Sequence, residues 1–99
     1  MSEFGDEKVR SALADRGDSG QTPRHTLFYF YHGNLDQLAA AAIRAGYKVG
    51  PTINNDGLVL ETTIAVDEQS FAPRAQQMRA WADEFGSEYD GWECKLVNQ

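Results

Sequence analysis

The sequence contains little of what stabilises or anchors many other small proteins. Cys94 is its one cysteine, which excludes an internal disulfide framework and a zinc or iron–sulfur site built from several cysteines. The longest uninterrupted apolar run covers residues 38–43, far below the roughly 18 residues of a membrane span. The first residues are acidic and lack the apolar segment of a signal peptide. We therefore expect a soluble protein of the cytoplasm.

Basic residues are also few. The chain has 9 lysines and arginines against 15 aspartates and glutamates, and its net charge is −6. The excess lies near the C-terminal end, where residues 83–99 contain one base, Lys95, and the acids Asp83, Glu84, Glu88, Asp90 and Glu93. Such a segment repels nucleic acid, because affinity for nucleic acid comes largely from lysine and arginine. It attracts a basic protein segment or a cation, unless it serves solubility alone.

What the sequence does contain is one globular domain. The chain has 99 residues, of which 41% are hydrophobic and 24% are charged, values near the average for globular proteins with room for one core. Residues 1–23 are predicted to form a short helix, residues 7–16, and a linker rich in turn residues. Residues 24–99 are expected to form the domain itself.

The hydrophobic pattern of this domain alternates between strand and helix periods. It predicts strands over residues 25–32, 47–53, 58–66 and 88–96, and helices between Asn34 and Gly46 and from Asp67 or Ser70 to Gly86. Each helix joins two strands that run in the same direction, and the middle pair of strands is a hairpin. Right-handed crossovers then give a four-stranded antiparallel sheet with both helices on one face, the ferredoxin-like α+β sandwich.

Local signals add detail to this pattern. Residues 34–37 (Asn-Leu-Asp-Gln) form a variant of the capping box, and Ile43 is expected on the apolar face of the first helix. Pro73 is expected in the first turn of the second helix, where a missing N–H is harmless. The Asp-Gly pair at residues 56–57 is expected to supply the positive φ of a hairpin turn. Gly91 is expected to mark a bulge in the last strand.

The first strand is apolar on both of its sides. Phe28 and Phe30 point to one face of the sheet, while Leu27, Tyr29 and Tyr31 point to the other. A strand with one side in water should alternate between apolar and polar residues. We therefore expect the second face to be covered by the N-terminal helix, by a second copy of the chain or by a different protein. The tyrosines suit such an interface.

The sequence predicts no catalytic, metal or cofactor site. His25 and His32 lie seven residues apart and are expected on opposite faces of one strand. Cys94 has no evident group that would lower the pKa of its thiol. The C-terminal carboxylates lack the spacing of a calcium loop, and no glycine-rich phosphate loop is present in the sequence. None of these residues therefore carries a motif on which catalysis could be assigned.

The most individual stretch covers residues 81–92, which place carboxylates beside large amphipathic rings. Such a mixture suits an interface that docks arginine or lysine. The alternative is a helix end, a cap and a strand with two core aromatics. Together with two residues of the first strand, this stretch supplies the candidate protein-binding residues Glu84, Glu88, Tyr89, Asp90, Trp92, Tyr29 and Tyr31.

Three motifs resemble one known family. They are residues 85–92 (Phe-Gly-Ser-Glu-Tyr-Asp-Gly-Trp) after an amphipathic helix, residues 45–49 (Ala-Gly-Tyr-Lys-Val), and residues 22–30 (Thr-Pro-Arg-His-Thr-Leu-Phe-Tyr-Phe). They are similar to motifs of the RraB-like family, regulators of ribonuclease E activity. The resemblance implies a ferredoxin-like fold without enzymatic activity. It also implies a regulator that binds the endonuclease, through an arginine-rich region of that enzyme, and inhibits RNA cleavage. Residues 88–92 carry the matching motif.

Two other functions stay open at the level of the sequence. The aromatic first strand allows a ferredoxin-like module that contacts RNA, although the third strand has no aromatics and carries Glu61. A small enzyme or small-ligand sensor with a pocket between the sheet and the N-terminal helix is the other alternative. The expected partner is a protein with a basic segment, such as ribonuclease E, and the chain itself is expected to be a monomer or a homodimer.

Overall fold

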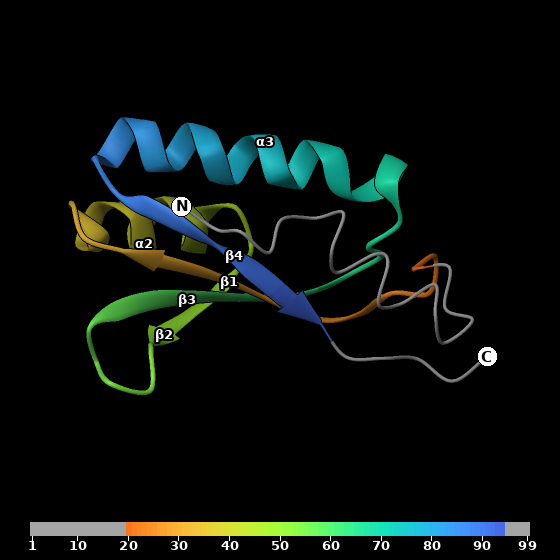
Figure 1. The fold of residues 1–99 in the computed structure, drawn as a ribbon, viewed down its shortest axis with the longest axis horizontal. Helices are drawn as coiled ribbons and strands as arrows, with labels where there is room; N and C mark the ends of the chain where they lie inside the picture. Colours follow the sequence, from red (N-terminus) through yellow and green to blue (C-terminus); the bar gives the residue numbers. More distant parts are fainter. Residues whose placement is uncertain (1–19, 95–99) are drawn as a thin grey trace.

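The computed structural model describes residues 20–94, so the expected N-terminal helix lies outside the described residues. The elements follow one another in the order β1 (Arg24–Tyr31), α2 (Leu35–Arg44), β2 (Lys48–Pro51), β3 (Gly57–Ile64), α3 (Glu68–Phe85) and β4 (Glu88–Cys94). The strands form an antiparallel sheet in the order β2-β3-β1-β4 (Figure 1). This is the predicted ferredoxin-like α+β fold. The short β2, which ends on a proline, is an edge strand, where a missing N–H is tolerated.

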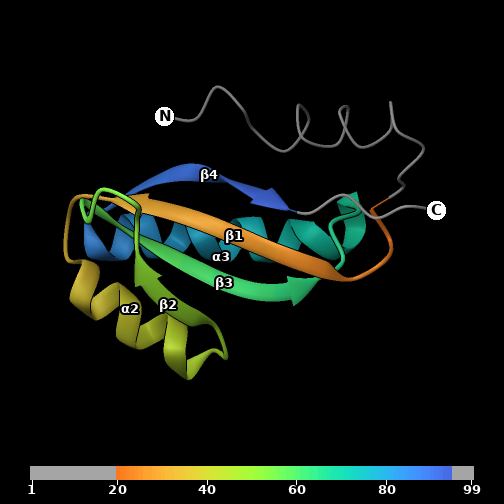
Figure 2. The ribbon, with the colours of Figure 1, turned by 90° about the horizontal axis from the view of Figure 1, so that it is seen from below.

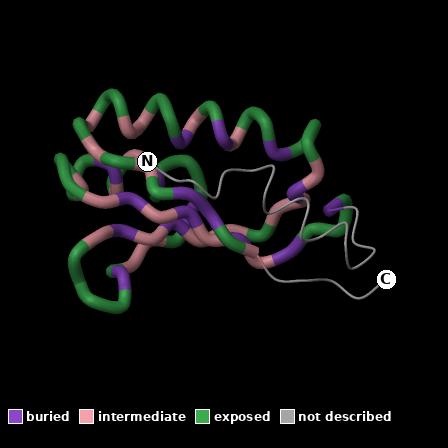
Figure 3. Tube along the Cα trace, viewed as in Figure 1, coloured by how far each residue is buried: buried purple, intermediate pink, exposed green. Residues whose placement is uncertain are grey.

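Both helices pack on one face of the sheet, and the core lies between the two layers. Along β1 burial alternates residue by residue, because successive side chains point to opposite faces. Phe28 and Phe30 are fully buried, together with Leu38 of α2 and Met78 of α3. Figure 3 shows buried positions along the strands and along the side of α3 that faces them. In Figure 2 the strands lie in front of α3, so this view shows the opposite face, which we call the open face.

The helix ends follow the predicted signals in most details. The Asn34 side chain accepts a hydrogen bond from the backbone N–H of Gln37 at 3.2 Å. The backbone N–H of Asn34 donates to the carbonyl of Phe85. In a full capping box this N–H would donate to the Gln37 side chain, so that hydrogen bond is replaced by one to the end of α3. Asp67, and not Ser70, caps α3. The predicted helix ends at Gly46 and Gly86 are both left-handed.

Two predictions about the helices are wrong. Because Asp67 is the cap, α3 begins at Glu68, and Pro73 lies inside the helix beyond its first turn. The carbonyl of Gln69, four residues earlier, therefore receives no hydrogen bond from position 73. Ile43 leaves the apolar face of α2 and is 58% exposed. The reason is that α2 turns Leu38 and Ala42 toward the sheet, and this places Ile43 at the edge of the contact.

The hairpin turn between β2 and β3 differs from its prediction. The positive φ falls at Asn55, with a value of 57°, while Gly57 already belongs to β3. Gly57 is needed for space and not for its φ angle. A Cβ atom at this position would lie 2.6 Å from the carbonyl oxygen of Phe30 and 2.6 Å from a ring carbon of Tyr31. The tyrosine ring on the neighbouring strand thus lies directly over the glycine.

The predicted bulge at Gly91 is confirmed. Phe28 pairs with Trp92 and Phe30 pairs with Tyr89, so β4 has one more residue than β1 between these two pairs. Gly91 has a φ of 106°, a value that glycine adopts without strain. The extra residue shifts the alternation of β4 by one position. Tyr89 and Trp92, which would otherwise point to opposite faces, therefore both point toward the helices.

Candidate functional site

The bulge places the aromatic and the acidic candidate residues of β4 on opposite faces of the sheet. The Trp92 ring is buried and its centroid lies 4.1 Å from that of Phe71. The Tyr89 ring packs beside Phe30, with the two centroids 5.3 Å apart. Both rings belong to the contacts that hold α3 and the sheet together. Their predicted part in protein binding stays a prediction, and what they do in the fold is to stabilise it.

The carboxylates of β4 point the other way, toward the open face. Glu88 and Glu93 pair with Tyr31 and Leu27 of β1, two residues whose side chains lie on that face. Asp90 is exposed at the bulge, and its charge acts on Tyr31. Glu84, in the last turn of α3, is exposed on the helix layer. The structure thus brings the acids of β4 together with the tyrosines of β1, whereas Glu84 stays with the helices.

The two tyrosines of β1 are half-buried on the open face and interact with acids. The Tyr29 hydroxyl donates a hydrogen bond to the Glu93 carboxylate. Partial burial and this neighbouring carboxylate raise the pKa of Tyr29 above its ordinary value. Desolvation, followed by the charges of Asp56 and Asp90, also raises the pKa of Tyr31. The raised pKa values favour the protonated hydroxyls, and the Tyr29 proton is the one donated to Glu93.

These residues line an open groove of about 510 Å³, which we call the open-face groove. Its central strands contribute apolar and aromatic side chains, β4 contributes an acid, and the turn between β2 and β3 forms one wall. The lining residues are Leu27, Tyr29, Tyr31, Val59, Glu93, Pro51, Thr52, Ile53, Asn54 and Asp56. Ile53 stands fully exposed on this wall. Sequence reasoning missed residues 51–56 as part of the site, because they meet the tyrosines only after the hairpin has closed.

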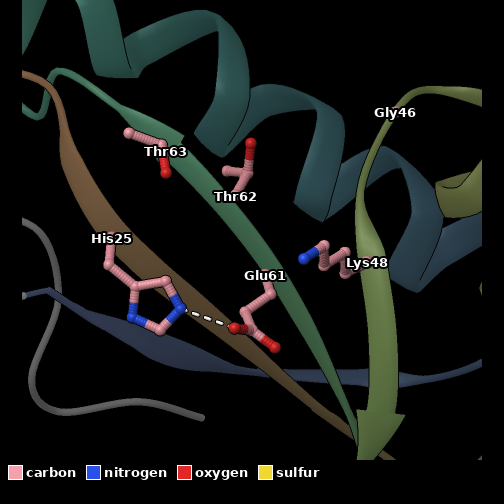
Figure 4. A pocket seen from close by; sticks show the side chains of 6 residues that line it. All are labelled: His25, Gly46, Lys48, Glu61, Thr62 and Thr63. Atoms are coloured by element: carbon pink, nitrogen blue, oxygen red, sulfur yellow. Dashed lines mark hydrogen bonds and ion pairs between the residues drawn. The ribbon is translucent and has the colours of Figure 1, made fainter.

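A smaller hollow of about 230 Å³ lies at the other end of the same sheet (Figure 4). His25 and Glu61 point toward each other there, with Nε2 and Oε1 2.6 Å apart. Lys48 of β2 pairs with Glu61 in the strand register. The side chains of His25 and Glu61 are 40% and 44% exposed, and an ion pair in such contact with water contributes little stability. Among residues 20–94 no group of histidine, cysteine and acidic side chains is arranged to hold a metal ion.

Charge therefore differs between the two ends of the open face. At the end with His25, the carboxylate of Glu61 is hydrogen-bonded to His25 of β1, and Lys48 of β2 lies opposite Glu61 in the strand register. At the end with Tyr31, the groove is bordered by acids of the turn and of β4, Asp56 and Asp90. That end attracts a positively charged group.

No helix within the described part of the chain is long and apolar enough to cross a membrane.

Two comparisons with known proteins bear on the family of this chain. No curated protein matches the sequence. A family model described as RraB, regulator of ribonuclease activity B, matches residues 5–94. The match includes each helix and strand given above, and thus both the core and the open-face groove. A match over this much of the sequence shows that the chain belongs to the RraB family of regulators of ribonuclease activity.

Proposed function

We propose that this protein regulates a ribonuclease by binding it and catalyses no reaction itself. The family match supports regulation of ribonuclease activity. The arrangement of β4 supports binding as the means, because acids and tyrosines share the open face while Trp92 and Tyr89 complete the core. The expected partner is ribonuclease E, or another protein with a basic segment.

The single observation that carries this proposal is the line of acids beside aromatic rings on the open face. Glu88 and Asp90 of β4 are exposed there. Charges at the rim of an interface steer a partner of opposite sign toward it and make binding sensitive to salt. Aromatic rings such as Tyr31 supply contact area at small entropic cost, and they are frequent among the residues that dominate affinity. Together they suit a basic protein segment.

The proposal is tested with purified ribonuclease E and a labelled RNA substrate. The full chain is expected to slow cleavage, and the double variant Glu88→Lys/Asp90→Lys is expected to need about tenfold more protein for the same effect, a change of ~1.4 kcal/mol. The matched control Asp36→Lys/Asp83→Lys makes the same change of charge on the helix layer and is expected to act like the wild type. Adding salt is expected to weaken inhibition.

Two results would count against the proposal. Equal inhibition by the wild type and by Glu88→Lys/Asp90→Lys would remove these acids from the mechanism. Unchanged cleavage at every concentration of the wild type would remove ribonuclease E as the target, and capture with other candidate ribonucleases would follow.

RNA contact is the second candidate, because Tyr29 and Tyr31 lie on the central strand of an open sheet face, where related topologies stack bases. The carboxylates of Asp56, Asp90 and Glu93 stand beside these rings, and they oppose the approach of phosphates. A gel shift with single-stranded RNA at low salt decides between the two. No shift at high protein concentration would exclude this candidate.

A further inference from the structure

The open-face groove has one end that is fitted for a flat cation. Tyr31 is the central feature of this end. Its ring lies over Gly57 of the neighbouring strand, close enough that a Cβ atom there would be 2.6 Å from the ring. Because the ring rests against the backbone of β3 on that side, its freedom to move is reduced before any partner arrives. A fixed aromatic ring costs less entropy on binding than a mobile one.

Acids stand around this ring from two different elements. Asp56, from the hairpin turn, lines the groove together with Tyr31. Asp90 lies at the bulge of β4, two residues from Glu88, the register partner of Tyr31, and the charges of both acids raise the pKa of the Tyr31 hydroxyl. Asp56 is itself held in place, because its carboxylate accepts a hydrogen bond from the Thr52 hydroxyl at 2.6 Å. Further along the groove the Glu93 carboxylate accepts from Tyr29. A carboxylate has room for several hydrogen bonds, so these acids can accept more.

The opposite end of the open face differs in its charge. There His25 and Glu61 pair with each other across β1 and β3, and Lys48 pairs with Glu61 in register across β3 and β2. A cationic side chain gains little from a carboxylate that already has such neighbours. At the end with Tyr31 the Glu88 carboxylate likewise lies 3.9 Å from His32, but the further acids Asp56 and Asp90 act on Tyr31 there. This excess of acids makes the end with Tyr31 the preferred place for a cation.

We propose that the open-face groove binds an arginine side chain of an extended segment of a partner protein, with the guanidinium on the Tyr31 ring and against the carboxylates of Asp56 and Asp90. This inference rests on the proposed function and names the contact that it uses. Arginine fits better than lysine, because the planar guanidinium stacks on aromatic rings and pairs with carboxylates through two hydrogen bonds. A second copy of the chain fits poorly, since its open face has the same negative charge.

The test is direct binding of short labelled peptides to the full chain, measured by fluorescence anisotropy at low salt. The probes are a peptide with arginines spaced by glycine and serine, the same peptide with lysines, the same with glutamates, and a single-stranded RNA of similar length. We expect the arginine peptide to bind about five- to tenfold more tightly than the lysine peptide, as stacking on a partly desolvated ring predicts. The glutamate peptide and the RNA are not expected to bind.

Variants of Tyr31 locate the contact. Tyr31→Phe keeps the ring and is expected to retain affinity for the arginine peptide within about twofold, while Tyr31→Ala is expected to lose about five- to tenfold. Because Tyr31→Ala also uncovers Gly57, the melting temperature of this variant is measured together with its affinity for the peptide. Amide shifts of the wild-type chain on titration with the peptide give an independent map, and they are expected at Tyr31, Asp56 and Asp90.

Several outcomes would overturn the inference. These are equal affinity for the arginine and lysine peptides, unchanged binding by Tyr31→Ala, amide shifts outside the groove, preferential binding of the RNA, or a dimer that excludes the peptide. The inference and the proposed function can fail separately. Peptide binding in the groove without inhibition of the ribonuclease would contradict the proposed function alone. Inhibition that persists in Tyr31→Ala, without binding of the peptide, would contradict this inference alone.

Discussion

At the scale of single residues, this protein uses glycine for two different physical reasons. Gly91 provides a φ of 106° at the bulge, a value that other residues rarely adopt. Gly57 has an ordinary strand conformation, but the Tyr31 ring and the Phe30 carbonyl leave no space for a Cβ atom. The position of Tyr31 in the groove therefore depends on a glycine on the neighbouring strand.

We expect Gly57→Ala to lower the free energy of unfolding by about 1–3 kcal/mol, because the added methyl group must displace the Tyr31 ring or the backbone of β1. The matched control is Gly50→Ala in β2, where nothing lies within 4 Å of the added atom. That change is expected to be neutral or to stabilise by about 0.4–1 kcal/mol, since alanine reduces the entropy of the unfolded chain. Urea denaturation measures both variants, and equal stability of the two would contradict the argument.

At the scale of the elements, α3 and β4 each depart from a regular pattern. In β4 one extra residue moves the rings of Tyr89 and Trp92 to the core and leaves Glu88, Asp90 and Glu93 on the open face. In α3 the cap at Asp67 places a proline within the helix. The bulge in β4 places the acids of the candidate site on the open face. The proline within α3 weakens a helix that covers the core.

We expect Pro73→Ala to raise the free energy of unfolding by about 1–3 kcal/mol, because alanine restores the hydrogen bond to Gln69 and suits a helix interior far better than proline. The reverse change at an exposed position further along α3, Ala80→Pro, serves as the control and is expected to cost about 3 kcal/mol or more. Thermal and urea unfolding provide the measurement. A Pro73→Ala variant less stable than the wild type would show that the proline fits its present place.

At the scale of the whole molecule, the two faces of the sheet have different roles. One face is closed by α2 and α3 over a core of aromatic and aliphatic side chains. The other presents tyrosines with acids around them. The acids give this face a negative charge beside its aromatic rings, and like charges oppose the pairing of two identical faces.

We expect the chain to be a monomer at low ionic strength in sedimentation equilibrium, because face-to-face pairing would bring the acids of two copies together. Neutralising Asp56 and Glu93 of the groove together with the neighbouring Asp90, by Asp56→Asn/Asp90→Asn/Glu93→Gln, is expected to promote self-association. The control Asp36→Asn/Asp83→Asn/Glu84→Gln removes the same charge from the helices and is expected to stay monomeric. A wild-type dimer that Tyr31→Ala dissociates would contradict this expectation.

Much of the fold can be predicted from the sequence, because the signals involved are local. The alternation in β1, the helical spacing in α2 and α3, and the glycines at the helix ends depend on residues close to one another in the chain. The errors concern Pro73, Ile43 and Gly57. In each case the outcome depends on which residue caps the helix or on what packs beside the residue, and local spacing does not contain that information.

The sequence by itself determined the order of the strands and helices, the two-sided apolar character of β1 and the family to which the chain belongs. Only the tertiary structure decided which side chains of residues 85–92 complete the core and which reach the open face. The physical reason is the register of β4 against β1, where a single extra residue exchanges the two faces of the strand. The groove likewise exists only after the β2–β3 turn, β1 and β4, which are distant in the chain, have come together.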